Sequence, residues 1–330
     1  MPEQACASAP GKLFLFGEYA VLEGASAIVT AVDRRALAHC QPSPSGWSIS
    51  AADLALEHVP LWPQQPAPDT RLIFVQSLLD VMAERGILPA RPQHLIVSTQ
   101  AFHDDAGKLG LGSSAALTGA LLTALLAAAD IDMTPGARFD CALAAHRRAQ
   151  SGRGSGGDVA AALWGGTLDF GQNRPPEPLA PLDALMVLCV RAGAPASTGD
   201  LLASLNYRRA KAPAVAHRLA ELVKFAEQAV AAWRAADAVA LIGLADAYGE
   251  GMAQLGRDAD LPIAGPRDAA LRQLARAHGG AYKPSGAGGG DVGLIFMLRR
   301  NMNRRIMASL RAEGAAPLAL SLHARGAAPD

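Results

Sequence analysis

The sequence predicts an α+β chain folded as two domains. A length of 330 residues is enough for two domains or for one large one. Segments with strand-like and helix-like patterns occur in both halves of the chain. The stretch Arg174–Pro181 contains four prolines, a composition typical of a boundary between domains. We therefore expect an N-terminal domain over residues 1–178 and a C-terminal domain over residues 179–330.

In the first half, short apolar runs between glycine turns indicate strands at Lys12–Phe16 and Ala27–Val32, with Arg35–Cys40 as a third candidate. Residues 41–70 predict a strand or two among loops. Strand-like runs are also expected at His94–Thr99 and Gly165–Phe170. Helical apolar spacing or helix-favouring composition predicts helices over Arg71–Arg85, Leu117–Ala129, Ala137–Gln150 and Val159–Leu163.

The second half also mixes the two types of element, which indicates helices packed on a small sheet. Strands are expected at Ala184–Arg191, Val292–Leu298 and Pro317–Leu322. Helices are expected at Ala212–Ala235, Ala236–Leu255, Arg267–His278 and Asn301–Ala312.

The composition narrows the class of protein. Hydrophobic residues make up 50% and charged residues 18%, which is typical of a globular chain. The net charge is zero, which argues against a broad nucleic-acid-binding surface. The four cysteines lack zinc-ligand or redox spacing, so we expect a reduced, cytoplasmic protein. There is no signal-peptide pattern, and the apolar run Leu117–Ala129 is too short to cross a bilayer, so no membrane partner is expected.

The segment Gly110–Ala116 carries the strongest functional signal. Its glycines and serines run directly into Leu117–Ala129, which is almost wholly Ala and Leu. Because Ser favours N-cap positions, Ser113 and Ser114 are expected to cap this helix. The backbone N–H groups at a helix N-terminus form an anion site. An ordinary capped core helix is the alternative interpretation.

The lysines support an anion site. Only five lysines occur among the 30 Lys and Arg residues, and three of them lie in glycine-rich segments: Lys12, Lys108 and Lys283. A compact ammonium beside backbone amides is suited to a phosphate chain.

Two other nucleotide-binding patterns are not favoured. The segments Gly110–Ala115, Gly152–Gly157 and Gly288–Gly293 match a dinucleotide fingerprint loosely. None of them has both a strand before the first glycine and a helix after the third, as a nicotinamide or flavin site requires. A Walker loop is also absent, because neither Lys12 nor Lys108 is followed by Ser or Thr.

Taken together, three segments resemble the motifs of the GHMP small-molecule kinases: Pro10–Tyr19, then Gly110–Ala116 as the phosphate loop, then Lys283–Gly293. They occur in the family's order and span most of the chain. The resemblance implies an N-terminal domain of the ribosomal-protein-S5 domain 2 type and a ferredoxin-like C-terminal domain, with ATP in the cleft between them. It implies a kinase that uses ATP and Mg²⁺.

Within the family, several details resemble the phosphomevalonate kinases. Tyr19 follows the motif-one glutamate, where mevalonate kinases usually have His. The stretches Ala149–Ala161 and Ala194–Thr198 and the three glycines before Asp291 are also similar to that subfamily. Arg147 stands where mevalonate kinases carry a magnesium-binding glutamate, which leaves the second magnesium ligand open.

The resemblance implies catalytic roles for Lys12 and Asp158, which pair beside the acceptor in the family. For an alcohol acceptor Asp158 would be a general base, whereas a phosphomonoester with a second pKa near 6 is already mostly ionised. Lys12 would then matter more, by offsetting the charge of two anions. The alternatives are that Asp158 caps a helix beginning at Val159 and that Lys12 is a surface lysine.

The remaining site residues follow from the same resemblance. ATP is expected at Lys108, Gly110, Leu111, Gly112, Ser113, Ser114 and Ala115, with the Ser114 hydroxyl as a Mg²⁺ ligand. The acceptor is expected at Glu18, Tyr19, Ser155, Ser197, Thr198, Lys283, Ser285, Gly286, Ala287 and Gly288. Structural alternatives are a turn at Ser285–Asp291, an exposed Lys283–Asp291 ion pair and a turn at Ser197 and Thr198. The histidines His103, His146 and His278 are not expected to be catalytic.

The leading hypothesis is phosphoryl transfer to phosphomevalonate in isoprenoid synthesis, by a monomer or homodimer with a small-molecule acceptor. Three alternatives stay open: a mevalonate kinase, a diphosphomevalonate decarboxylase, and a non-catalytic sensor on the same fold.

Overall fold

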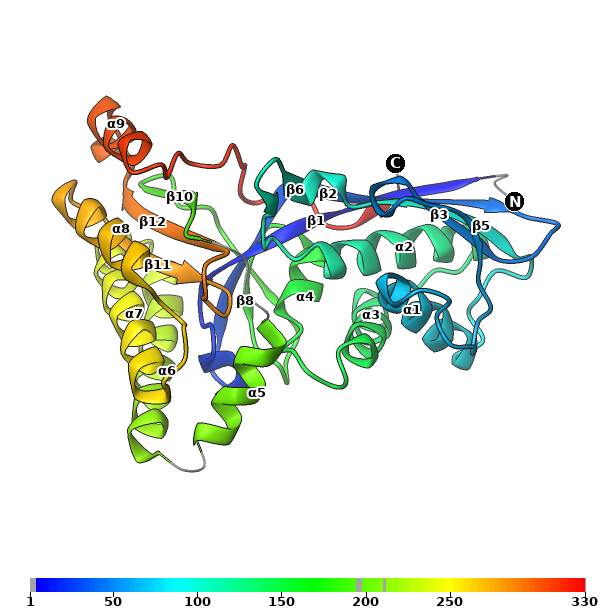
Figure 1. Ribbon diagram of the computed structural model, residues 1–330, viewed down its shortest axis with the longest axis horizontal. Coiled ribbons are helices and arrows are strands. Elements are labelled where there is room, and N and C mark those ends of the chain that lie inside the picture. The colour runs from blue at the N-terminus through cyan, green and yellow to red at the C-terminus, as the bar shows by residue number, and fades with distance from the viewer. Residues whose placement is uncertain (1–3, 194–197, 210–211, 330) are drawn as a thin grey trace. The chain divides into compact units, whose positions relative to one another are not determined.

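The computed structural model describes residues 4–193, 198–209 and 212–329. The chain divides into two compact units, each discontinuous in sequence (Figure 1). Unit 1 comprises Met1–Lys12, Ala31–Gly166 and Ser321–Asp330, and unit 2 comprises Leu13–Thr30 and Thr167–Leu320. The first two strands run through both units, which is why neither unit is one stretch of chain. A division of the family's domains after residue 178 stays a prediction.

Unit 1 contains most of the larger sheet. Its strands lie in the order β13-β1-β2-β5-β3-β4, with β2 antiparallel to β5 and β3 parallel to it. The bounds are β1 Ala5–Phe16, β2 Ala27–Pro42, β3 Ser48–Ala51, β4 Leu56–Pro60, β5 Gln93–Ser98 and β13 Ala328–Pro329. A short hairpin of β6 (His103–Asp104) and β7 (Gly107–Lys108) precedes the predicted phosphate loop.

Four helices cover unit 1's sheet in Figure 1: α1 Ile73–Glu84, α2 Ser113–Ala129, α3 Pro135–Ala149 and α4 Gly157–Trp164. Helix α2 is apolar nearly all round because it packs against each of the other three. Short 3₁₀ turns lie at η1 Ala20–Glu23, η2 Ala52–Leu54, η3 Thr70–Leu72, η4 Gln100–Phe102 and η5 Arg299–Asn301, the first and last of them in unit 2.

The last ten residues complete unit 1. The Gly166 N–H donates to the Ala324 carbonyl at 2.8 Å, and the Ala327 N–H donates to the Ala162 carbonyl at 2.8 Å. Arg35 of β2 donates to the Arg325 carbonyl at 2.8 Å. Strand β13 then pairs with β1. This segment therefore closes the unit to which the chain's first residues belong.

Unit 2 has an antiparallel sheet in the order β10-β12-β11, with bounds β10 Leu185–Arg191, β11 Ala281–Ser285 and β12 Val292–Leu298. Strands β8 (Thr167–Phe170) and β9 (Glu177–Leu179) extend the N-terminal part of β2. The helices are α5 Thr198–Arg209, α6 Pro213–Arg234, α7 Ala238–Ala259, α8 Pro266–Ala277 and α9 Arg304–Ala312. Apolar side chains of β10–β12, α8 and α9 form a buried core, among them Tyr282, Ile295 and Ile306.

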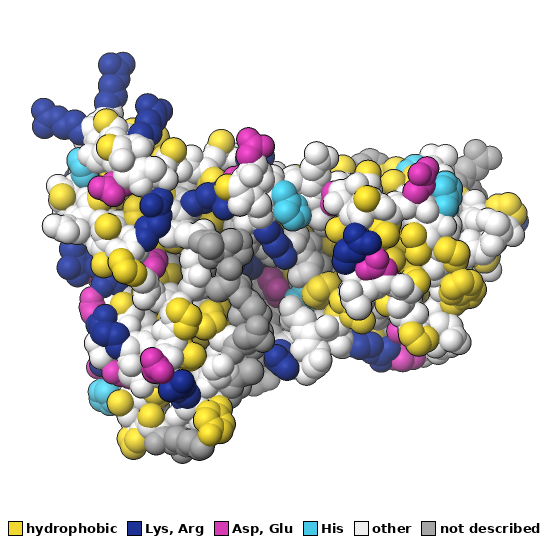
Figure 2. All heavy atoms as spheres, viewed as in Figure 1, with side chains coloured by type: hydrophobic (Ala, Val, Ile, Leu, Met, Phe, Trp, Pro, Cys, Tyr) yellow, Lys and Arg dark blue, Asp and Glu magenta, His cyan; other side chains and the backbone are white. Residues whose placement is uncertain are grey.

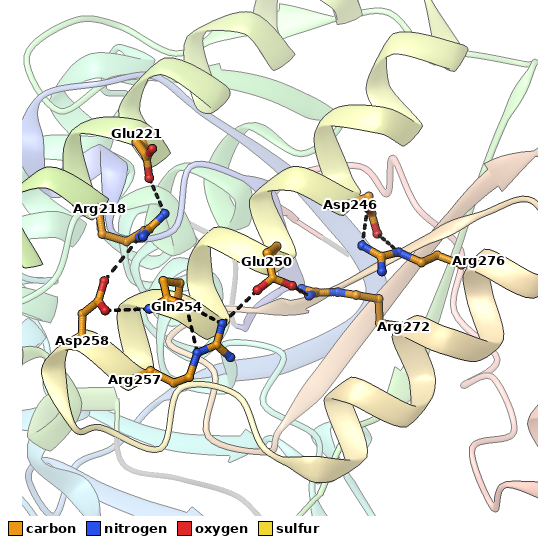
Figure 3. Close-up of polar contacts among 9 residues, drawn as sticks. All are labelled: Arg218, Glu221, Asp246, Glu250, Gln254, Arg257, Asp258, Arg272 and Arg276. Atoms are coloured by element: carbon orange, nitrogen blue, oxygen red, sulfur yellow. Dashed lines mark hydrogen bonds and ion pairs between the residues drawn. The ribbon is translucent and has the colours of Figure 1, made fainter. Parts of the chain in front are cut away.

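Ion pairs link the outer surfaces of α6, α7 and α8 (Figure 3). Glu250 of α7 accepts from Arg272 and, at 2.9 Å, from Arg257, while Asp246 accepts from Arg276 at 2.7 Å. Most of these side chains are partly or largely exposed, so each pair contributes little free energy. Figure 2 shows a second charged feature, a group of Lys and Arg side chains over α9.

Most of the predicted elements are confirmed to within a few residues, except that Ala27–Val32 and Arg35–Cys40 belong to the single strand β2. One predicted strand is wrong. Pro317–Leu322 forms no strand: Pro317 makes a single bridge to Val190, and Leu322 makes one to Val32. Because each end contacts a different strand at one residue, no ladder forms. Strand β1 also begins earlier than expected and contains Gly11. A Cβ on Gly11 would lie 2.7 Å from the Leu111 carbonyl, so this glycine permits close packing within a strand instead of a turn.

Candidate functional site

The predicted phosphate loop turns into α2 at a glycine. Gly112 is the N-cap residue, with a left-handed φ of 77°, and the helix begins at Ser113. The expectation that Ser113 and Ser114 cap this helix is therefore wrong: the sharp turn at Gly112 places both serines inside the first helical turn. The N–H groups of a first turn have no acceptor within the helix, so they are oriented toward whatever lies at its N-terminus.

Lys12 lies against this loop. Its backbone N–H donates to the Leu111 carbonyl at 2.8 Å, and its Nζ lies 3.5 Å from the Gly110 carbonyl. A Cβ on Gly112 would lie 3.1 Å from Cγ and Cε of Lys12. The structure thus brings the first and second predicted motifs together. Lys108, in contrast, lies exposed on β7 opposite His103.

Three helices of unit 1 bring Ser114, His146 and Asp158 together. The Nε2 atom of His146 lies 3.2 Å from Oγ of Ser114 and 3.7 Å from Oδ2 of Asp158. His146 has only 2% of its side chain exposed, and its ring centroid lies 5.1 Å from that of Phe74. Sequence reasoning did not assign His146 to the site, because nothing in the spacing linked it to a residue on another helix.

The interpretation of Asp158 as a helix cap is wrong. Helix α4 begins at Gly157 after Gly156, whose left-handed φ of 92° makes it the N-cap. Asp158 therefore lies within the first turn, and its Oδ1 accepts from the Val159 N–H at 2.9 Å. The Ser155 hydroxyl accepts from the Gly157 N–H at 3.3 Å, so it helps to form this turn. A contact between Ser155 and the acceptor substrate stays a prediction.

Unit 2 contains a buried ion pair. Nζ of Lys283 lies 2.5 Å from Oε1 of Glu18, and their side chains are 0% and 2% exposed. Burial raises the pKa of the Glu18 carboxyl and lowers the pKa of the Lys283 ammonium, while each partner's charge opposes the shift in the other. Nζ also donates to the Pro284 carbonyl at 2.8 Å and lies 5.7 Å from the centre of the Tyr248 ring. The alternative of an exposed ion pair with Asp291 is therefore wrong.

The part of the first predicted motif that belongs to unit 2, residues 13–19, contacts the glycine loop that follows β11 (residues 286–291). The Tyr19 hydroxyl donates to the Ala287 carbonyl, and the Ser285 hydroxyl donates to the Phe14 carbonyl at 2.9 Å. Tyr19 itself has a positive φ of 61°, a rare conformation for a bulky residue. The Tyr248 hydroxyl fixes the same segment by donating to the Glu18 carbonyl at 2.6 Å. The first and third predicted motifs therefore meet in unit 2.

The glycine loop joins β11 to β12 as the connection of a hairpin, and its predicted role in binding the acceptor stays a prediction. Gly286, Gly288, Gly289 and Gly290 all have positive φ angles. A Cβ on Gly288 would lie 2.1 Å from the Ile263 carbonyl, so that position has no room for a side chain. Of the other predicted acceptor residues, Ser197 lies outside the described residues, and Thr198 begins α5 with a side chain that is not described.

The donor set near Ser114 suits a nucleotide-borne magnesium ion. Within the described ranges, no group of three or more His, Cys, Asp or Glu side chains is placed to hold a metal ion. Mg²⁺ commonly takes one or two protein oxygens and completes its shell with phosphate and water. The Ser114 hydroxyl and the Asp158 carboxylate are hard oxygen donors of that type, so these residues fit a metal that arrives with its phosphates.

Comparison with known proteins identifies the family. The model of the GHMP kinase N-terminal domain matches residues 106–166. A curated phosphomevalonate kinase from Streptomyces sp. (strain CL190) is 32% identical, with 88% of each chain covered. The chain therefore belongs to the GHMP kinase family.

Solved structures show the same fold. The Lin0012 protein from Listeria innocua is similar with a TM-score of 0.86 and 25% identity, covering 99% of each chain. A Streptococcus pneumoniae phosphomevalonate kinase in complex with phosphomevalonate and AMPPNP has a TM-score of 0.78 and 20% identity, covering 96% of this chain and 99% of its own. The expected GHMP kinase fold is thus confirmed, and the chain is a kinase. In the part of the chain that the structure describes, no helix has the length and apolarity needed to cross a membrane.

Proposed function

We propose that this kinase transfers the γ-phosphoryl group of ATP to phosphomevalonate, giving a diphosphate. The 32% identity to a curated phosphomevalonate kinase over most of both chains carries the assignment of the acceptor. The Ser114–His146–Asp158 cluster and the contact of Lys12 with the predicted phosphate loop at Gly110 support phosphoryl transfer.

Different groups of unit 1 bind different parts of the nucleotide. The backbone N–H groups at the start of α2 hold phosphate oxygens, and the Lys12 ammonium offsets their charge. The Ser114 hydroxyl would hold Mg²⁺, which when bound would neutralise part of the phosphate charge. Asp158 contributes little as a general base, because the acceptor phosphate is mostly ionised at neutral pH. Its carboxylate instead orients Lys12 and the acceptor.

In unit 2, the backbone of the glycine loop after Ser285 binds the acceptor. Glycines let a charged ligand approach the main chain closely. The loop is preorganised by Tyr19 and Ser285, whose hydroxyls donate to backbone carbonyls of the same unit. We also propose that the enzyme is cytoplasmic, which its four free cysteines support. We propose that it is a monomer or a homodimer.

One assay tests the acceptor. The protein is incubated with Mg-ATP and, in turn, mevalonate, its 5-phosphate, its 5-diphosphate and homoserine, while ADP and CO₂ are measured. ADP release only with the 5-phosphate is the expected result. ADP release with mevalonate would assign a mevalonate kinase, and CO₂ from the diphosphate would assign a decarboxylase. Ligand binding without turnover would assign a sensor.

A further inference from the structure

We propose that His146 is a positioning residue that orients the Ser114 hydroxyl toward the metal-bound nucleotide. This inference rests on the proposed role of Ser114, but not on the identity of the acceptor. His146 comes from α3, whereas Ser114 and Asp158 come from the first turns of α2 and α4. The imidazole therefore lies at the point where three helices of unit 1 meet.

The geometry assigns the hydrogen bond. Nε2 of His146 is within hydrogen-bonding distance of the Ser114 hydroxyl at 3.2 Å, while the 3.7 Å to Asp158 is too long for a hydrogen bond. A serine hydroxyl has one proton and two lone pairs, and a metal ligand must present a lone pair. If the Ser114 proton is donated to Nε2, both lone pairs are directed away from the ring. His146 thereby selects the hydroxyl orientation that a cation requires.

Burial makes this orientation persistent. The ring is 2% exposed and packs beside Phe74, so it has little freedom to turn. A partner that holds a metal ligand in place in this way typically changes metal affinity or activity about 10–100-fold when it is removed. The competing explanation is structural: a buried histidine needs a hydrogen-bond partner, and Ser114 merely supplies it.

The chain offers a matched control for that explanation. In unit 2, Nε2 of His278 lies 3.1 Å from Oγ of Ser309, which is the same type of pair. Neither residue belongs to the predicted site. A variant of His278 therefore reports what the loss of a histidine–serine hydrogen bond does to the fold alone.

The test compares His146→Asn with His146→Gln. The longer Gln side chain can place its amide oxygen near the position of Nε2, whereas Asn cannot reach it. The affinity for AMPPNP is measured by calorimetry with Mg²⁺ and with EDTA. We expect His146→Asn to weaken binding about 10-fold or more with Mg²⁺ and less than about 2-fold with EDTA. His146→Gln should restore most of the loss, and His278→Asn should change neither value.

Three results would overturn the proposal: equal weakening with Mg²⁺ and EDTA, the same loss in His278→Asn, or a lower Tm for His146→Asn with unchanged Mg²⁺-dependent affinity. If His146→Asn does not fold, the test uses His146→Leu, which fills the buried site without a hydrogen bond, together with Ser114→Ala and their double variant. Ser114→Ala should lose the Mg²⁺-dependent part of the AMPPNP affinity, and adding His146→Leu should not weaken binding further. Additive losses would refute the coupling. Because the affinity measurement uses no phosphoryl acceptor, it tests the role of His146 even if the acceptor assay contradicts the proposed substrate.

Discussion

Glu18 and Lys283, which are 265 positions apart in the chain, form an ion pair from which solvent is excluded. The pair joins the segment after β1 to the strand that leads into the glycine loop. Removing one partner from such a pair costs far more than removing both, because a single charge is left buried and uncompensated.

This relationship predicts non-additive losses of stability. Lys283→Met should lower the free energy of unfolding by about 3–5 kcal/mol, since Glu18 then has no counter-charge. The double variant Glu18→Gln with Lys283→Met should be less destabilised than the sum of the two single variants. Urea unfolding at neutral pH measures all three. Additive losses would mean that the two side chains do not depend on one another.

Tyr19→Phe should weaken acceptor binding specifically. The change removes the hydroxyl that holds the Ala287 carbonyl and leaves the ring in place. Loss of one such hydrogen bond corresponds to a rise in acceptor KM of up to about tenfold, with the KM for ATP unchanged. Steady-state kinetics with each substrate varied in turn would show this. Tyr207→Phe, at a side chain that is 63% exposed, is the control; an equal change in the KM for ATP would contradict the assignment.

Gly112→Ala should impair catalysis more than folding. Its φ of 77° costs an L-residue about 1–2 kcal/mol, and a new Cβ would press on the Lys12 side chain. We expect kcat/KM to fall at least about tenfold, which is 1.4 kcal/mol of transition-state stabilisation. The control is Gly136→Ala in α3, where a Cβ meets nothing within 4 Å. Activity equal to that of the control would show that the loop tolerates displacement of Lys12.

Lys12→Met and Asp158→Asn should each slow turnover at least about 100-fold while the Tm stays close to that of the unmodified protein. The reason is that each would remove a charge that the proposed mechanism places beside the transferred phosphoryl group. Single-turnover rates with saturating Mg-ATP and acceptor provide the measurement, and Lys224→Met on α6 is the surface control. A near-normal rate in either variant would remove that residue from the mechanism.

The cysteines should differ sharply in reactivity. Burial, with a smaller contribution from nearby Cys6, raises the pKa of the Cys40 thiol from 9.0 to about 12. Since the thiolate is the nucleophile, iodoacetamide at pH 8 should label exposed Cys6 and leave Cys40 intact, as mass spectrometry can show. The unfolded chain loses this proton first, so Cys40's contribution to stability, complete below pH 9, should be lost as the pH rises toward 12. Labelling of Cys40 in the folded protein would contradict its burial.

The sequence alone predicted most of the elements to within a few residues, because composition and periodicity are local properties, while phosphate binding at Gly110–Ala116 stays a prediction. It did not find His146, since Ser114 and Asp158 lie 32 and 12 positions away from it and only the packing of helices brings them together. It placed the cap of α2 on the serines because the rule for N-caps favours Ser over Gly. The positive φ of Gly112, which decides the matter, cannot be read from residue types.

The route of the chain has a consequence for its biosynthesis. Strand β1 precedes every other helix and strand of the described chain, yet one of its neighbours, β13, contains Ala328 and Pro329. A nascent chain therefore lacks the pairing of Ala7 and Ser8 with β13 until residues 328 and 329 have been made. Neither unit can complete its fold from the residues that emerge early. A chain cut before residue 321 would therefore lack the backbone hydrogen bonds by which this segment closes unit 1.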